Sequence, residues 1–107
     1  MRYGSVMKLQ GGQTYRTQDT AICGQVAAGS LLVYIVPYEG EIPGKKMYLC
    51  TVSEGDYIPF LDMEMSEKHW NFQLAAQERA EIRFLKAGDM PAQTRKTFAK
   101  NAGVLLF

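Results

Sequence analysis

The 107-residue sequence is poor in the side chains that metal sites and nucleophilic catalysis require. It contains one histidine, His69, and two cysteines, Cys23 and Cys50. A cupin-type metal site needs two or three histidines with a carboxylate, which one histidine cannot supply. A zinc site made of these three residues would have no Cys-x-x-Cys pair to anchor it, and a Cys–His nucleophile pair would depend on the fold. We therefore expect no catalytic residues, no metal and no cofactor.

The sequence also lacks targeting, membrane and phosphate-loop signals. Its longest apolar run, LLVYIVPY at 31–38, is about one third of the length needed to span a bilayer. No signal-peptide core begins the chain, and neither GGQT nor CGQVAAG has the lysine of a phosphate-binding loop. A net charge of +1 gives no field that would attract nucleic acid or an acidic membrane. We expect a cytoplasmic domain with no nucleic-acid partner and no direct membrane insertion.

The residues that are abundant favour a β fold. Ten glycines and six tyrosines suit strands joined by turns, and the length suits one domain, 1–107. Apolar periodicity predicts a β-rich part at 5–88. Within it we expect strands at 5–9, 21–23, 30–38, 47–52, 70–76 and 80–87. The strand at 30–38 is apolar on both faces, so it should be central.

Two hairpins and one helix follow from the connections. The turn segment 39–46 should join strands 30–38 and 47–52, and residues 77–79 should join 70–76 to 80–87. Segment 61–69 has no clean period and reads as a loop or one helical turn. Asp89 and Pro91 favour the start of a helix at about 90–102, which Gly103 would end. The apolar end VLLF suggests a fragment of a longer chain.

The stretch SEGDYIPF, at 53–60, contains the most informative turn. Gly55-Asp56 should reverse the chain and lead into Tyr57 and Phe60. Trp70 follows and could serve the core, an interface or ligand stacking. Between them lies a small acidic cluster, for which solvated side chains and acid–base chemistry are the two alternatives. The cluster consists of Asp62, Glu64 and Glu67.

The order of these elements resembles the β-roll of cyclic-nucleotide-binding-like domains. Strand motifs, the Gly-Asp turn and an A-x-E-x-A-E segment occur in the same order over about 20–85. The matching positions are Gly29, Val33, Tyr34, Leu49, Val52, Gly55, Asp56, Ala76, Glu78, Ala80, Glu81 and Ile82. The resemblance implies a mainly β, cupin or cyclic-nucleotide-binding-like β-roll of the jelly-roll type with a C-terminal helix.

A narrower stretch, GSLLVYIVPYEGEIPGKKMYL, resembles the N-terminal accessory domain of NHLM-type peptide-export ABC transporters. That resemblance implies a non-catalytic regulatory or docking domain of a bacteriocin exporter. Its partners would be other domains of the transporter or a substrate peptide, and a homodimer is a further option.

The sequence departs from true cyclic-nucleotide sites after the turn. Those sites carry a Gly-Glu pair, whose glutamate binds the ribose, and an arginine for the cyclic phosphate. Between Gly55 and Trp70 this chain has no arginine and no second glycine, so the guanidinium contact to phosphate is missing. We expect a degenerate nucleotide site. A small-ligand or cyclic-nucleotide sensor and a cupin-like metal enzyme are the alternative functions. The predicted ligand or partner surface is Gly55, Asp56, Tyr57, Phe60 and Trp70.

Overall fold

The computed structural model of the chain describes residues 3–94, 96 and 98. The described part is mainly β, as predicted, with ten strands and a short 3-10 helix, followed by helical residues at 92–94, 96 and 98. The elements are β1 Val6–Leu9, β2 Thr14–Arg16, β3 Ile22–Ala28, β4 Ser30–Glu39, β5 Ile42–Pro43, β6 Met47–Ser53, β7 Tyr57–Pro59, β8 Asp62–Met65, β9 Lys68–Ala75, β10 Ala80–Lys86 and η1 Ala87–Asp89.

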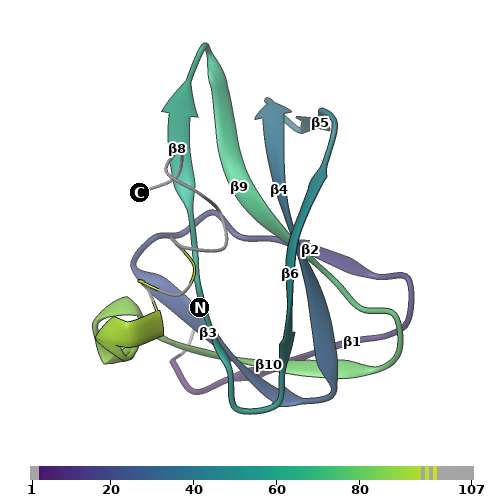
Figure 1. Ribbon diagram of the computed structural model, residues 1–107, viewed down its shortest axis with the longest axis vertical. Helices are drawn as coiled ribbons and strands as arrows, with labels where there is room; N and C mark the ends of the chain where they lie inside the picture. Colours follow the sequence, from purple (N-terminus) through teal and green to yellow (C-terminus); the bar gives the residue numbers. More distant parts are fainter. Residues whose placement is uncertain (1–2, 95, 97, 99–107) are drawn as a thin grey trace.

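The strands form two antiparallel sheets that curl around one core. The first sheet has the order β1-β10-β3-β7. The second sheet has the order β2-β9-β4-β5. In addition, β6 pairs with β4, and β8 pairs with β9. In Figure 1, β4, β8 and β9 rise at the top of the molecule, while β1, β3 and β10 cross its lower part. The predicted central position of the strand at 30–38 is confirmed, because β4 pairs on both of its edges.

Alternating side chains of β4 and β9 build one wall of the core. Phe72 and Leu74 are fully buried on β9, and they pair with Ile35 and Val33 of β4. Ile82 on β10, in the first sheet, is part of the same buried hydrophobic cluster. Because strand side chains alternate between two faces, the period-2 pattern in the sequence correctly predicted these inward positions. Burying such side chains stabilises the fold by about 1.5–3 kcal/mol each.

The two predicted hairpins had different outcomes. β4 and β6 pair antiparallel as predicted, with a β-bulge between Val33 and Tyr34. The connection also contains the short strand β5, which folds back on β4 after Gly40. The second hairpin is wrong, since β9 and β10 lie in different sheets and 77–79 crosses between them. Alternation of apolar and polar residues shows which face of a strand is buried. It does not show which strand is the partner, because the strands of both sheets carry the same pattern.

Four strands were not predicted: β2, β5, β7 and β8. Segment 61–69 is a tight hairpin of β8 and β9, whose turn residues Ser66 and Glu67 have φ values of 54° and 63°. Such turns usually carry Asn-Gly or Asp-Gly, and neither pair occurs in this segment. β2 has only three residues, which are too few to show a period in the sequence.

The C-terminal part is helical where it is described. Residues 92–94, 96 and 98 have helical backbone conformation, and the Phe98 ring packs 5.7 Å from the Phe72 ring centroid. The remainder of the helix predicted at about 90–102, its Gly103 cap and the VLLF end lie outside the described residues. Of the helical segments that are described, none is long and apolar enough to cross a membrane.

Candidate functional site

The Gly55-Asp56 turn joins the two sheets at one end of the roll. Gly55 has a φ of +93°, which only glycine adopts easily. Its N–H donates to the Val26 carbonyl at 2.9 Å, and the Val26 N–H donates to the Asp56 carbonyl at 2.9 Å. The Ser53 N–H donates to Asp56 Oδ2 at 2.8 Å. The turn is therefore fixed both to the strand that it leaves and to β3 of the other sheet.

A cavity of about 230 Å³ lies beside this turn. Its walls come from β6, the turn and the helical C-terminal residues. The lining residues are Cys50, Thr51, Val52, Asp56, Tyr57, Gln93, Thr94 and Phe98. The volume is below the roughly 300–1,000 Å³ of pockets for drug-sized ligands, so the cavity suits a small ligand.

The predicted surface is divided between this cavity and the core. Asp56 and Tyr57 line the cavity, and Gly55 shapes the turn beside it. Phe60, by contrast, is 7% exposed and packs 6.0 Å from the Tyr15 ring and 6.1 Å from the Phe84 ring. Phe60 therefore belongs to an aromatic cluster in the core and does not face a ligand.

Trp70 lies apart from the cavity. It is on β9, opposite Pro37 of β4 and Met63 of β8, and it is partly buried against the core. Its indole Nε1 is buried and has no hydrogen-bond partner among the described residues. A buried indole N–H usually finds a partner, but Trp70 does not line the cavity beside the turn.

Cys50 is a cavity residue that sequence reasoning did not select. Burial, and secondarily the charge of Asp56, raise the pKa of its thiol. A raised pKa leaves less thiolate at neutral pH and makes a poor nucleophile. Cys23 is fully buried on β3, where its thiol donates to the Lys86 carbonyl at 3.4 Å, and Cys50 is a free thiol. The inward periodicity of β6 could have identified Cys50, whereas nothing in the sequence places Gln93 or Thr94 beside it.

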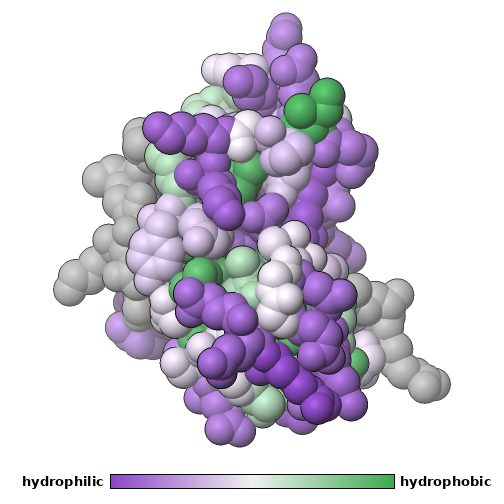
Figure 2. Space-filling view, turned by 90° about the vertical axis from the view of Figure 1, so that its right-hand side faces the viewer, coloured by the Kyte–Doolittle hydropathy of each residue, from purple (hydrophilic) through white to green (hydrophobic). Residues whose placement is uncertain are grey.

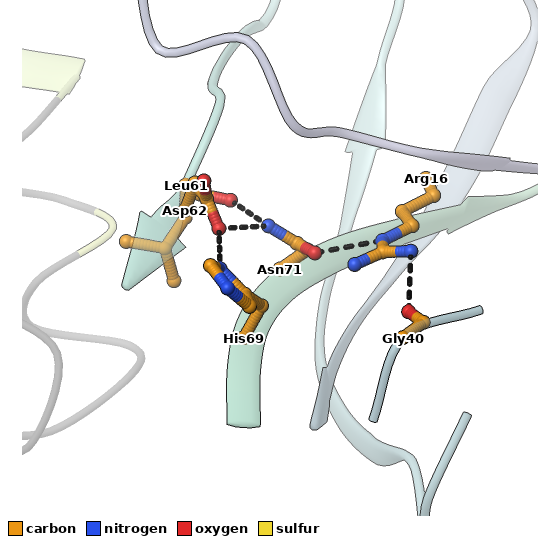
Figure 3. A network of polar contacts seen from close by, with 6 residues as sticks. All are labelled: Arg16, Gly40, Leu61, Asp62, His69 and Asn71. Atoms are coloured by element: carbon orange, nitrogen blue, oxygen red, sulfur yellow. Dashed lines mark hydrogen bonds and ion pairs between the residues drawn. The ribbon is translucent and has the colours of Figure 1, made fainter. Parts of the chain in front are cut away.

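A second set of polar contacts lies on the outer side of β9 (Figure 3). Asn71 is fully buried, and its Oδ1 accepts from Arg16 Nε at 2.8 Å. Its Nδ2 donates to the Leu61 carbonyl at 2.7 Å and to Asp62 Oδ1 at 3.2 Å. His69 Nδ1 donates to the same Asp62 oxygen at 2.9 Å. These contacts tie β2, β8 and β9 together.

Arg16 has further partners at the β4–β5 connection. Its guanidinium lies 3.8 Å from the centroid of the Tyr38 ring, and Nη1 donates to the Gly40 carbonyl at 3.2 Å. Nη1 also lies 3.7 Å from the carboxylate of Glu41. The Arg16 side chain is only 15% exposed, so this arginine is committed to structure and is not available to a phosphate.

The acidic cluster predicted at 62–67 does not assemble as a metal or acid–base site. Asp62 pairs with His69, whereas Glu64 and Glu67 are exposed. The hydrogen bond from His69 is the main cause of a lowered Asp62 pKa, and a carboxyl with a lowered pKa is a poor general acid at neutral pH. Across residues 3–94, 96 and 98, no three His, Cys, Asp or Glu side chains are grouped to hold a metal ion.

Exposed hydrophobic residues do not form one large patch. Hydrophilic residues dominate the face shown in Figure 2, and the hydrophobic ones appear in small separate groups. Scattered exposed hydrophobic side chains are normal in single domains. Those with the largest exposure among the described residues are Ile42, Tyr48, Tyr3, Met47, Met65 and Val6.

Comparison with known proteins identifies the fold. No protein-family model and no curated sequence matches the chain. Its structure is similar to the Thermus thermophilus catabolite activator protein, with a TM-score of 0.53, 22% identity and coverage of 97% of this chain and 48% of that one. A second similar structure is the c-di-GMP-responsive global regulator CLP of Xanthomonas campestris (TM-score 0.53, 9% identity, 94% and 47% covered). A third is a CooA mutant from Carboxydothermus hydrogenoformans (TM-score 0.51, 16% identity, 91% and 37% covered).

These similarities confirm the predicted cyclic-nucleotide-binding-like β-roll at the level of fold. The chain spans about half or less of the length of the three solved structures. At identities this low they show the fold and not a shared ligand. The narrower resemblance to the transporter accessory domain finds no support among them.

The same comparisons contradict our expectation that the protein has no nucleic-acid partner. The similar structures include a catabolite activator protein and a global regulator that links signalling to virulence gene expression. We had inferred the absence of such a partner from the net charge of +1. The charge was counted over 107 residues, about half the length of the matched regulators, and is no evidence against a nucleic-acid partner.

Proposed function

We propose that this chain is a non-catalytic regulatory domain that binds a small ligand in the cavity beside the Gly55-Asp56 turn. The cavity is the observation that supports this function, because it lies where strands of both sheets meet a C-terminal segment. A ligand there would contact β6, the turn and Gln93 or Thr94 together. Such a ligand can change how these parts pack, which is what a regulatory domain requires.

We propose further that the domain is not an enzyme. The single histidine lies on β9, bonded to Asp62, and does not line the cavity. The cavity thiol, Cys50, has a raised pKa and is poorly suited to nucleophilic attack. We also propose a cytoplasmic location, in keeping with the free thiol of Cys50.

The degenerate nucleotide site fits this picture. No lysine or arginine is among the described residues that line the cavity, and Phe60 is part of the core. We expect cyclic AMP and cyclic GMP to give no heat of binding at millimolar concentration in calorimetry.

The proposal is tested by a thermal-shift screen of small molecules against the 107-residue chain and against Thr94→Trp. A large indole at Thr94 should fill the cavity, so ligands that stabilise the original chain should not stabilise this variant. Lys96→Trp is the matched control, because Lys96 is exposed and does not line the cavity. Ligands that stabilise all three proteins equally would contradict a site in this cavity.

A second candidate is docking within a peptide-export transporter. One observation favours it: the segment that carries the transporter resemblance exposes Ile42 by 71%, Tyr48 by 58% and Met47 by 49%. Replacing Ile42 and Met47 by serine in the parent transporter should then reduce export. Unchanged export, with normal expression, would argue against docking through this hairpin.

A further inference from the structure

The cavity beside the turn has a one-sided charge distribution. Asp56 is the only charged residue among its described lining residues, and the others are neutral. The side chain of Asp56 is held at the turn by the Ser53 N–H, which donates to Oδ2 at 2.8 Å. The backbone on either side is fixed by the bonds to Val26. The carboxylate therefore occupies a defined place at the cavity wall.

This carboxylate acts on Cys50, another residue that lines the cavity. Its negative charge is one of the two causes that raise the pKa of the Cys50 thiol, after burial. Raising a thiol pKa means that a second negative charge at Cys50 is disfavoured. The same field opposes an anionic ligand, such as a cyclic phosphate, and favours a positive one.

Two aromatic rings complete the lining. Phe98 is 4% exposed, and its ring is fixed against Phe72 at 5.7 Å between centroids. Tyr57 is half-buried at the start of β7, directly after Asp56. Aromatic faces attract cations, and sites that combine rings with a carboxylate recognise quaternary ammonium groups. Thr51, Gln93 and Thr94 add neutral polar groups to the wall.

We propose that the cavity takes a small organic cation, with Asp56 as its counter-ion and Tyr57 and Phe98 as its aromatic walls. A trimethylammonium compound with a hydroxyl tail is the chemical class that fits best. Its charge matches Asp56, its methyl groups match the rings, and its hydroxyl can bond to Thr51, Gln93 or Thr94. This inference rests on the proposed ligand-binding function and adds the ligand class.

The test compares two probes of nearly the same shape by calorimetry. Choline carries the positive charge, and its carbon analogue dimethylbutanol does not. We expect choline to bind in the millimolar range and dimethylbutanol at least fivefold more weakly. Cyclic AMP, as an anion, should not bind. Binding of dimethylbutanol equal to that of choline, or no binding of choline, would overturn the ligand class.

Variants identify the groups responsible. Asp56→Asn keeps an oxygen to accept from Ser53 but removes the charge, and it should weaken choline binding about tenfold. Glu54→Gln is the matched control, since Glu54 is exposed on the same turn and does not line the cavity. Tyr57→Leu should weaken binding roughly two- to fivefold, the usual value of an exposed cation–π contact, and Tyr57→Phe should not.

The outcomes separate this inference from the proposed function. If Asp56→Asn leaves choline affinity unchanged, the ligand class is wrong. In that case another molecule whose stabilising effect is lost in Thr94→Trp would still support a ligand-binding cavity. If no molecule distinguishes Thr94→Trp from Lys96→Trp, the cavity itself is not a site and both fail. Circular dichroism of each variant checks that the fold is retained.

Discussion

The Asp62 carboxylate accepts a hydrogen bond from His69 Nδ1 across the β8–β9 hairpin at 2.9 Å. This bond is the largest cause of the lowered pKa of Asp62, with Asn71 and Arg16 contributing in the same direction. A carboxyl whose pKa is lower in the folded state stabilises the fold above its unfolded pKa. That contribution is lost as the pH falls through the folded value.

The pair gives a pH-dependent prediction. Asp62→Asn should lower stability at pH 7, and its difference from the original chain should shrink below about pH 4, where the unfolded carboxyl is protonated. Urea unfolding at pH 7, 5 and 3 measures this. Glu64→Gln, an exposed substitution on the same strand, should show no such trend. A gap that widens between pH 5 and pH 3 would contradict the assigned role.

The buried amide of Asn71 predicts a larger loss. Asn71→Ala leaves the Leu61 carbonyl without its donor and removes the acceptor of Arg16 Nε. Unpaired buried polar groups cost about 1–3 kcal/mol each. We expect a loss of about 2–4 kcal/mol in the free energy of unfolding. Gln73→Ala, whose one bond to Tyr38 is long at 3.4 Å, should cost less than half as much.

Gly29 should be one of the least replaceable glycines. It has a φ of +74°, and an added Cβ would lie 2.7 Å from the Arg79 carbonyl oxygen. Gly29→Ala combines backbone strain with a steric clash against backbone atoms. Gly40 also has a positive φ, but nothing lies within 4 Å of an added Cβ. Gly40→Ala should therefore cost only about 1 kcal/mol, and Gly29→Ala should cost clearly more in thermal unfolding.

The two thiols should react very differently. Cys50 should be alkylated slowly by iodoacetamide at pH 7 and faster as the pH rises, because its raised pKa limits the thiolate. Cys23 is fully buried and should stay unmodified in the folded chain. Asp56→Asn removes one cause of the raised pKa, so Cys50 should react faster at a given pH. Mass spectrometry assigns the modified residue, and equal rates in both proteins would contradict the influence of Asp56.

The sequence predicted strands better than it predicted their partners. Alternation at Phe72 and Leu74 identified an inward face correctly, because burial on one face imposes period 2. It could not show that β9 and β10 lie in opposite sheets, since the pattern depends on burial and not on pairing. The Ser66–Glu67 turn escaped notice because non-glycine residues with positive φ leave no compositional signal.

The lining of the cavity could be reached from the sequence only in part, for a similar reason. Asp56 belongs to the turn and Tyr57 follows it directly, so both could be predicted from the local sequence. Phe60 has the composition of a surface anchor, yet its ring meets Tyr15 from a strand more than forty residues earlier. Cys50 and Thr94 come together only in three dimensions. Long-range contacts of this kind depend on the path of the chain, which no short window contains.

The bonds of the Gly55-Asp56 turn also determine how a disturbance would spread. The turn belongs by sequence to the end of β6, but two hydrogen bonds clamp it to Val26 in the opposite sheet. A displacement of Asp56 would therefore disturb both β6, through Ser53, and β3, through Val26. The corner therefore couples the two sheets directly, so that β6 and β3 cannot separate there without breaking these two hydrogen bonds.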